Sequence, residues 1–364
     1  MAVEIRLDKL RREFGQTIAV DSITETFTAQ SVTCLLGPSG CGKTTLMRMI
    51  AGLQEPSSGD IYFGDTCVTE MTPSERNIGM VFQYPVVYRG ISLFENIELP
   101  LKREKGLSKK DRQARVQNVL ETLDLMPYAK TDVMSLSNAL KQKAAVARAV
   151  ARQPQIILFD EPITNVDANA KVQLKRALKS LVRQHSQTIV YVTHDQTEAM
   201  TLADEIALMD AGRIIQRGRP RDIYNNPNNR FGGWFLGNPG MNFIKQKVEH
   251  VDGSFRLSSS LFRSPIAVSG LPDDSDVTLG IRPERVRLGV ETATSVKGEV
   301  VHTALVVGGQ TLASVQVGDV MVKIKVPHDQ PVEEGMTVDV DCLLDYVALF
   351  AENGEGLEFQ IQSG

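Results

Sequence analysis

The stretch that decides the fold is Gly37-Pro38-Ser39-Gly40-Cys41-Gly42-Lys43-Thr44, which fits the pattern G-x-x-x-x-G-K-[ST]. An apolar run at 31–36 precedes it, and a segment with helical spacing follows it at 45–51. Glycines let the backbone curl so that successive N–H groups face one anionic centre, and a helix N-terminus adds partial positive charge. The stretch therefore predicts a phosphate-binding loop between a strand and a helix in an α/β nucleotide-binding fold.

Individual side chains of this loop have predicted roles in binding ATP. Lys43 is expected to bridge the β- and γ-phosphates, and Thr44 is expected to ligate Mg²⁺. With Thr45, where the helix begins, the predicted ATP-binding stretch runs from Gly37 to Thr45.

Composition describes an ordinary globular chain with two or three domains. It has 364 residues, of which 42% are hydrophobic and 23% charged, and these values exclude a disordered, collagen-like or fibrous protein. The formal net charge is −4, so a globally basic nucleic-acid binder is excluded as well. The charge is uneven, with net +4 over residues 1–236 and net −8 over residues 237–364. This asymmetry suggests two parts with different tasks.

Cysteine spacing and hydropathy indicate a cytosolic chain. The four cysteines are Cys34, Cys41, Cys67 and Cys342, and no Cys-x-x-Cys pair occurs among them. This scatter argues against a metal knuckle or a disulfide framework, and it favours reduced thiols. The sequence shows neither a signal-peptide pattern nor an apolar run of about 18 residues. Any role at a membrane is therefore expected to act through a partner.

Polar side chains follow two buried runs of the predicted sheet. Asp160 and Glu161 follow the apolar run at 156–159, and His194 comes shortly after the run at 189–192. Ligands bind at the carboxyl ends of strands in an open parallel sheet. We expect Asp160 to hold Mg²⁺, Glu161 to orient and deprotonate an attacking water, and His194 to reach the γ-phosphate. The alternative, a solvated turn after the strand, is disfavoured because the phosphate loop already demands a metal carboxylate.

Helical patterns lie between these strands. Ser108 is expected to cap a helix carrying Val116, Leu120 and Leu123, and residues 103–153 are mostly helical in pattern. The apolar runs do not alternate, which suits central strands of a parallel sheet buried on both faces. We therefore expect an α/β domain over residues 1–236, with a helical subdomain at about 88–153.

The sequence pattern changes after the turn clusters at 225–229 and 237–240. Short β-branched runs separated by turns follow, at 277–281, 298–307, 311–317, 320–326 and 338–345. They predict a second, all-β domain over residues 237–364, with the form of a small barrel of the oligomer-binding type. Packing or assembly without a ligand of its own is the alternative role for this domain.

The ordered set of motifs resembles the ATPase subunit of an ATP-binding cassette (ABC) transporter. The phosphate loop, Leu136-Ser137, Asp160-Glu161 and His194 stand at the spacings of that family, over about residues 3–236. The resemblance implies that Gln83 senses Mg²⁺ and touches a transmembrane partner, and that Asp167 belongs to a loop that crosses the dimer interface. It also implies that Phe14 stacks on adenine; a surface phenylalanine in a turn is the alternative.

The second domain narrows the resemblance to maltose-type importer ATPases. Asn238-Pro239-Gly240-Met241-Asn242-Phe243 and Gly280-Ile281-Arg282-Pro283-Glu284 look like marker segments of that group. The resemblance implies import of a carbohydrate or polyol, with glycerol and glycerol phosphate within the class. It implies ATP and Mg²⁺ as cofactors, permease subunits as direct partners and a solute-binding protein as an indirect one. The implied location is the cytoplasmic face of the bacterial inner membrane, and no nucleic acid is involved.

One motif departs from the family. The signature Leu-Ser-Gly-Gly-Gln reads Leu136-Ser137-Asn138-Ala139-Leu140 here, so both glycines and the glutamine are missing. In the family this segment opens a helix that faces the nucleotide of the other subunit, where glycine permits close backbone approach. Ser137 is still able to donate a hydrogen bond, whereas Asn138, Ala139 and Leu140 form a degenerate contact.

Several interpretations follow from this departure. A homodimer would place a poor signature at both ATP sites, whereas a heterodimer would pair this chain's intact residues with a partner's intact signature. We favour the heterodimer. A regulatory subunit with little hydrolysis is a second interpretation, opposed by the intact Glu161 and His194. A soluble ABC ATPase of DNA repair or translation is a third, opposed because the chain has one cassette and no evident zinc or coiled-coil insertion.

Overall fold

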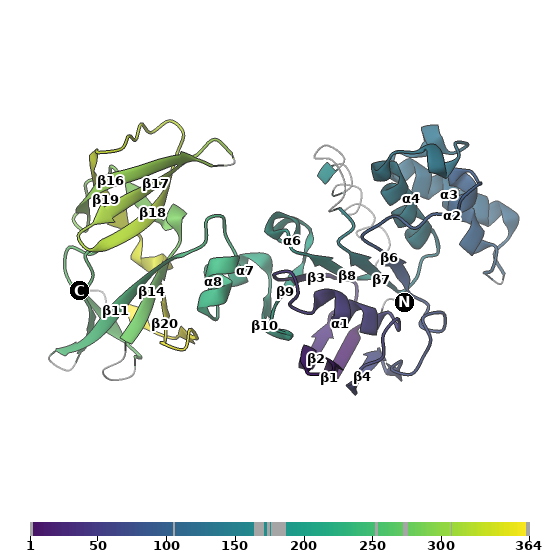
Figure 1. Cartoon of the computed structure of the whole chain (residues 1–364), viewed down its shortest axis with the longest axis horizontal. Coiled ribbons are helices and arrows are strands. Elements are labelled where there is room, and N and C mark those ends of the chain that lie inside the picture. Colours follow the sequence, from purple (N-terminus) through teal and green to yellow (C-terminus); the bar gives the residue numbers. More distant parts are fainter. Residues whose placement is uncertain are drawn as a thin grey trace. The chain divides into compact units, whose positions relative to one another are not determined.

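The computed structural model describes residues 3–104, 106–163, 171–172, 175, 187–251, 254–271, 276–306 and 308–361. The chain divides into two compact units, Met1–Pro220 and Arg221–Gly364 (Figure 1). This division falls earlier than residue 236, because helices α7 (Pro220–Asn225) and α8 (Arg230–Phe235) belong mainly to the second unit.

A six-stranded sheet forms the centre of the first unit. Its strand order is β10-β9-β3-β8-β7-β6, parallel except for β10. Strands β3, β7 and β8 are buried at every position, as expected for apolar runs covered on both faces. The strand bounds are Val32–Leu36 (β3), Gly79–Val81 (β6), Ile156–Asp160 (β7), Thr188–Thr193 (β8), Glu205–Asp210 (β9) and Arg213–Gly218 (β10).

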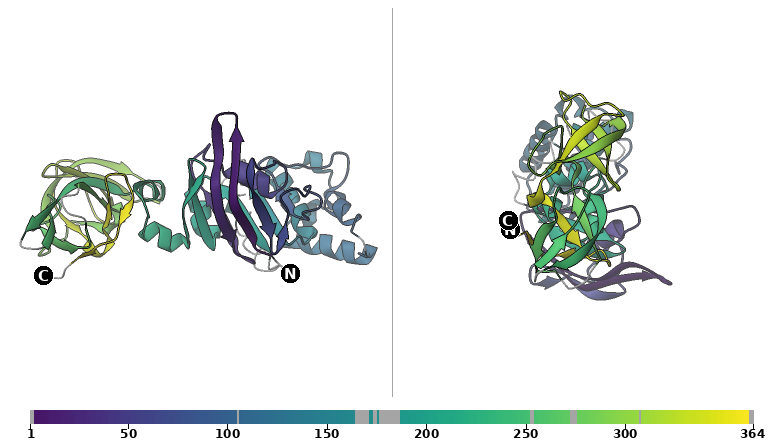
Figure 2. Two further views of the ribbon diagram at one scale, coloured as in Figure 1. Left: turned by 90° about the horizontal axis from the view of Figure 1, so that it is seen from below. Right: turned by 90° about the vertical axis from the view of Figure 1, so that its left-hand side faces the viewer.

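A second, antiparallel sheet of the first unit has the order β2-β1-β4-β5. Its long β1–β2 hairpin is the purple pair of strands in Figure 2. Helix α1 (Lys43–Ile50) packs between the two sheets, and Leu46, Met47 and Ile50 share one core with residues of both. The strand bounds are Ile5–Phe14 (β1), Thr17–Phe27 (β2), Ser58–Phe63 (β4) and Thr66–Cys67 (β5).

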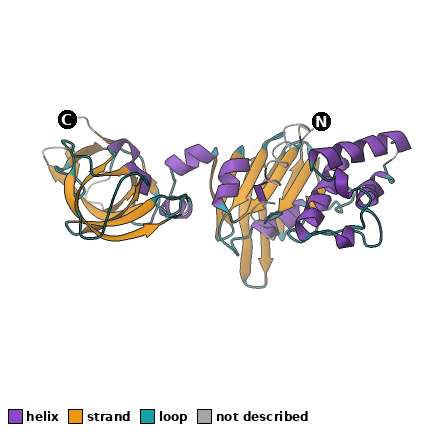
Figure 3. Ribbon diagram, turned by 90° about the horizontal axis from the view of Figure 1, so that it is seen from above, coloured by secondary structure: helices purple, strands orange, loops and turns teal. Residues whose placement is uncertain are grey.

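Helices α2 (Leu93–Leu101), α3 (Lys109–Thr122) and α4 (Asn138–Ala151) gather at one end of the first unit, where Figure 3 shows most of its purple ribbon. The predicted cap of α3 is confirmed, because the Ser108 hydroxyl accepts a hydrogen bond from the Asp111 N–H at 3.1 Å. Val116, Leu120 and Leu123 are buried as expected. Two short 3₁₀ turns, Met126–Tyr128 and Val133–Ser135, connect α3 to α4.

Two antiparallel sheets form the second unit around one apolar core. Their orders are β21-β20-β14-β11-β12-β13-β22 and β15-β19-β16-β17-β18. The all-β prediction is confirmed, and its strands curve around the core in Figure 3. The bounds are Asn242–Val251 (β11), Ser254–Leu257 (β12), Ile266–Ser269 (β13), Asp276–Ile281 (β14), Val286–Leu288 (β15), Val296–Leu305 (β16), Thr311–Val317 (β17), Val320–Val326 (β18), Thr337–Cys342 (β19), Ala348–Phe350 (β20), Gly356–Leu357 (β21) and Gln360–Ile361 (β22).

A buried arginine ties α7 and α8 to these sheets. Arg282 is 3% exposed, and its guanidinium donates to the carbonyls of Tyr224 (2.8 Å), Gly233 (3.0 Å) and Leu236. It also lies 3.9 Å from the centre of the Tyr224 ring. Burial lowers the pKa of Arg282, yet the carbonyl oxygens and the ring compensate for part of its lost hydration. The two helices therefore belong physically to the β-rich unit.

Replacing this arginine is expected to destabilise the second unit. Arg282→Ala should lower the free energy of unfolding by roughly 2–4 kcal/mol, because buried carbonyls lose their donor. Thermal unfolding of the purified chain measures the loss, and Arg287→Ala, at an exposed position of β15, is the matched control. Equal stability of the two variants would contradict this role.

Candidate functional site

The loop between β3 and α1 approaches neighbouring backbone more closely than a side chain allows. Gly42 has φ 105°, and a Cβ placed there would lie 2.2 Å from the Ala19 carbonyl oxygen. At Gly37, a Cβ would lie 2.2 Å from the Met209 carbonyl oxygen. Both positions therefore require glycine, and the loop is held against two separate strands of the unit.

Lys43 lies inside this loop. Its side chain is buried, and Nζ donates to the carbonyls of Gly37 at 2.8 Å and Pro38 at 2.7 Å. The ammonium group is thus held at the turn of the backbone, where it adds positive charge to the start of α1. This combination of a cation, curled backbone and helix N-terminus is suited to binding phosphate.

Two oxygen ligands for a divalent cation meet beside the loop. The Thr44 hydroxyl lies 3.4 Å from the Asp160 carboxylate at the end of β7. Burial raises the pKa of Asp160, with nearby Glu161 acting in the same direction, so a cation beside it would be stabilising. The described residues contain no cluster of three or more His, Cys, Asp or Glu that could hold a metal ion. The hydroxyl of Thr44 and the carboxylate of Asp160 are oxygen donors that fit Mg²⁺, which binds through one or two carboxylates and completes its shell with water and phosphate oxygens.

The structure brings Glu161, His194 and Gln83 together. His194 Nδ1 lies 3.1 Å from Glu161 Oε1, and Gln83 Nε2 lies 3.5 Å from Glu161 Oε2. Glu161 has φ 44°, and its N–H bonds to the Val192 carbonyl at 3.0 Å. A non-glycine residue in this left-handed region carries local strain, which is common at functional sites. The three side chains follow the ends of the adjacent strands β6, β7 and β8, and the sequence predicted this position for Glu161 and His194.

A buried polar network beneath His194 was missed by the sequence analysis. Glu198 is 2% exposed, and its carboxylate accepts hydrogen bonds from the hydroxyls of Tyr191 (3.0 Å) and Thr193 (2.9 Å). Lys175 Nζ lies 4.0 Å from the other carboxylate oxygen. Thr193 in turn accepts the Asp195 N–H at 2.9 Å, so the residues on both sides of His194 are fixed.

A signal for this network was present in the sequence. Asp195 and Glu198 have the spacing of a helix N-cap and the third residue of the first turn. In the structure, Asp195 caps α6 (Gln196–Leu202) by accepting from the N–H groups of Thr197 and Glu198. That capping pattern predicts the start of α6, but it does not predict that Glu198 turns inward to β8.

The degenerate signature still opens a well-formed helix. Ser137 is the N-cap of α4, and its hydroxyl accepts the Leu140 N–H at 3.3 Å. Asn138 is exposed, whereas Ala139 and Leu140 are partly buried. The N-terminal N–H groups of α4 therefore lie next to the side chain of Asn138, which a glycine at this position would lack. Asp167 lies outside the described residues.

Phe14 lies at the end of β1 and is 48% exposed. The Arg12 guanidinium lies 4.7 Å from the centre of its ring. An exposed aromatic face of this kind is able to stack on a flat ligand ring, and stacking tolerates different bases.

Comparisons with known proteins agree with this geometry. Residues 20–164 match the family described as ABC transporter, and residues 279–350 match the TOBE domain. The trehalose/maltose import ATP-binding protein MalK of Thermococcus litoralis is 38% identical, over 92% of this chain and 94% of that protein. The xylose/arabinose import ATP-binding protein XacJ of Haloferax volcanii is also 38% identical, over 78% and 74%. A dimeric ATP-binding cassette solved after hydrolysis with ADP and Pi is 27% identical, with a TM-score of 0.54, over 60% of this chain and 99% of that one.

The parallel sheet, the phosphate loop and the acidic strand ends define an ATPase of the ATP-binding-cassette class. With its TOBE domain and full-length similarity to MalK proteins, the chain belongs to the maltose-type ABC importer ATPases. Its enzymatic activity is therefore ATP hydrolysis coupled to transport. Among the described residues, no helix has the length and apolar character needed to cross a bilayer.

Removing the buried carboxylate beneath His194 should loosen the site. Glu198→Ala is expected to cost roughly 2–4 kcal/mol of stability, because two buried hydroxyls and a lysine lose their shared partner. Denaturant unfolding measures this cost, with Glu70→Ala at an exposed position as the control. An unfolding midpoint equal to that of the control would show that the network contributes nothing.

Proposed function

We propose that this chain hydrolyses ATP to energise an importer for a carbohydrate or polyol, with glycerol and glycerol phosphate within the class. The observation that carries the proposal is the convergence of Lys43, Thr44, Asp160, Glu161 and His194 at one edge of the parallel sheet. Its relatives, equally identical to this chain, are named for different sugars, trehalose/maltose and xylose/arabinose. The similarity of the ATPase subunit therefore supports only the class of solute. The permease and the solute-binding protein select the particular solute.

Phosphate binding begins at the loop 37–45. The backbone N–H groups and the start of α1 receive the phosphates, and Lys43 exchanges its carbonyl contacts for the β- and γ-phosphate oxygens. Thr44, Asp160 and Gln83 would hold Mg²⁺, which neutralises charge on the phosphate oxygens when bound. Phe14 stacks on the adenine.

Hydrolysis depends on Glu161. Its carboxylate orients a water molecule in line with the γ-phosphate and accepts the proton that the water loses. His194 lies within hydrogen-bonding distance of Glu161, so it fixes this carboxylate and faces the γ-phosphate. The Glu198 network holds the backbone on both sides of His194, and thereby limits the positions that its ring adopts.

The site is completed across a dimer interface. Ser137 and the start of α4 face the nucleotide of the other subunit, and the family resemblance assigns Asp167 to the contact between subunits. ATP closes the two subunits, closure moves the permease, and hydrolysis resets it. Tyr84, Val86 and Tyr88, which follow Gln83 and are 69%, 51% and 46% exposed, form the surface that docks on the permease at the cytoplasmic face of the inner membrane.

The degenerate signature favours a second ATPase subunit as the partner. Asn138 and Ala139 place side chains where close approach to a phosphate needs glycine. In a heterodimer, the nucleotide on this chain meets the partner's intact signature and is hydrolysed. The nucleotide on the partner meets Asn138 and Ala139, and it mostly stays bound without being hydrolysed. The degenerate signature also supports two alternatives. One is a homodimer with slow turnover, and the other is a regulatory subunit with little hydrolysis.

Glu161→Gln is expected to retain Mg-ATP binding and to lose most hydrolysis in the assembled transporter. The amide keeps the size of the side chain but does not accept the proton, and such losses are typically about 10²-fold or more. Phosphate release measures turnover, and Glu70→Ala is the matched control. Undiminished turnover would contradict the role of Glu161 and favour the regulatory alternative.

Restoring the signature glycines tests the heterodimer. With excess Mg-ATP, the Glu161→Gln chain of 40.1 kDa is expected to show no ATP-dependent increase in mass by light scattering. The same chain with Asn138→Gly and Ala139→Gly should shift to twice its mass. If the chain with Asn138 and Ala139 doubles equally on adding ATP, the signature permits self-closure and the homodimer is the better account.

A further inference from the structure

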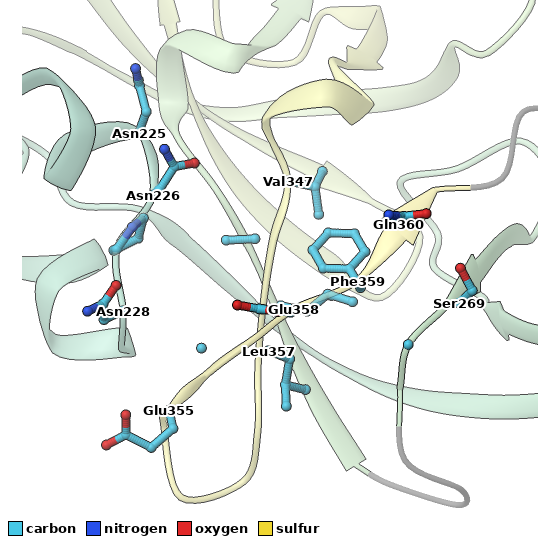
Figure 4. A pocket seen from close by; sticks show the side chains of 15 residues that line it. Asn225, Asn226, Asn228, Ser269, Val347, Glu355, Leu357, Glu358, Phe359 and Gln360 are labelled. Atoms are coloured by element: carbon cyan, nitrogen blue, oxygen red, sulfur yellow. The ribbon is translucent and has the colours of Figure 1, made fainter.

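A cavity lies entirely within the β-rich unit, away from the phosphate loop in the sequence. Its volume is about 1070 Å³, and it opens between the segment 225–228 and strands β13, β20, β21 and β22. Figure 4 shows asparagine side chains on one side, Ser269 and Gln360 on the other, and Glu358 between them. Such a volume is sufficient for a small organic ligand.

Backbone contacts fix the walls of this cavity. The Gly356 N–H donates to the Asn228 carbonyl at 2.7 Å, and a Cβ at Gly356 would lie 2.9 Å from that oxygen. Ser269 pairs with Gln360 in the β13–β22 ladder, and the Arg230 N–H donates to the Gly354 carbonyl at 2.8 Å. The cavity is therefore formed by paired backbone, and its shape does not depend on side chains alone.

The chemistry of the lining selects a class of ligand. The lining includes four amide side chains, two carboxylates and one hydroxyl, and its described residues carry no positive charge. Asn225, Glu358 and Gln360 are exposed along this lining, so their polar groups are accessible to a ligand. Amides donate and accept, whereas ionised carboxylates only accept. These groups suit a ligand with many hydroxyls, and the carboxylates disfavour an anion.

The apolar part of the lining fits the same class. Val347, Leu357 and Phe359 are partly buried and pack against the core of the unit, so they offer a fixed apolar wall. The C–H face of a sugar ring packs on such a wall while its hydroxyls reach the surrounding amides and carboxylates. A metal ion fits less well, because no cluster of metal-binding side chains occurs among the described residues.

We propose that this cavity binds a neutral sugar or polyol and thereby senses that class of molecule on the side of the membrane where the ATPase works. The segment 225–228 joins α7 to α8, and α7 begins at Pro220, the limit of the first unit. A ligand that bridges Asn225 to Gln360 would hold this joining segment against the strands. Regulation of import by this ligand rests on the proposed function, whereas the binding itself does not.

Calorimetric titration of the purified full chain tests the binding directly. The probes are glycerol, xylose, maltose and trehalose, with glycerol 3-phosphate as the anionic counterpart of glycerol. We expect saturable binding of at least one neutral probe at roughly millimolar concentration, and weaker binding of the anion. Hydrogen exchange at 225–228 and 356–360 should slow when that probe is bound.

Variants locate the binding. Glu358→Ala and Gln360→Ala should each weaken the affinity about tenfold, because each removes a hydrogen-bonding partner of the hydroxyls. Glu299→Ala, at an exposed position of β16, should leave it unchanged. Glu358→Gln keeps the size of the side chain and guards against a folding defect.

Three results would overturn the proposal. They are the absence of saturable binding by every neutral probe, affinities that do not respond to Glu358 and Gln360, and binding of glycerol 3-phosphate alone. Because ATP is left out of these titrations, their outcome is separate from that of the hydrolysis tests. A chain that binds a sugar but does not hydrolyse ATP would refute the proposed function and leave this inference standing.

Discussion

The close packing of two carbonyl oxygens against the glycines of the phosphate loop is the constraint on which the site depends. Ala19 reaches Gly42 from the antiparallel sheet, and Met209 reaches Gly37 from β9 of the parallel sheet. Both approaches are possible only without a Cβ, so the loop is fixed where the two sheets meet. Because the loop is fixed there, α1 begins between the two sheets. Lys43 is held at the turn of the loop, and Thr44 lies beside Asp160.

The sequence was most informative where one backbone requirement or one pattern dominates. The glycine loop, the fully apolar runs before Asp160 and His194, and the Ser108 cap were predicted from such patterns, and the structure contains all of them. The Glu198 network and the Arg282 anchor were not predicted, because each depends on contacts between residues whose separation in the sequence carries no periodic signal. The division of the chain at Pro220 was not predicted for the same reason. It depends on the hydrogen bonds from Arg282 to backbone carbonyls of the α7–α8 segment.

The chain combines an intact set of its own site residues with a degenerate signature, which we propose faces a partner subunit. Glu161 and His194 are held at 3.1 Å, and the strained backbone of Glu161 is fixed by the Val192 carbonyl. The start of α4 is equally well capped by Ser137, so the change to Asn138 and Ala139 has not disrupted the helix. The departure therefore alters what the start of α4 presents, which we propose faces a second subunit, and it leaves the helix of this chain well formed.

The central claim is that the loop 37–45 with its lysine is a working Mg-ATP site. Equilibrium titration of the purified chain with Mg-ATP, beside Lys43→Ala, tests this claim most directly. The account predicts saturable binding by the unaltered chain and a loss of affinity of at least about tenfold in the variant, because the buried ammonium that meets the phosphates is gone. Equal affinity of the two proteins, or no binding by the unaltered chain, would contradict it.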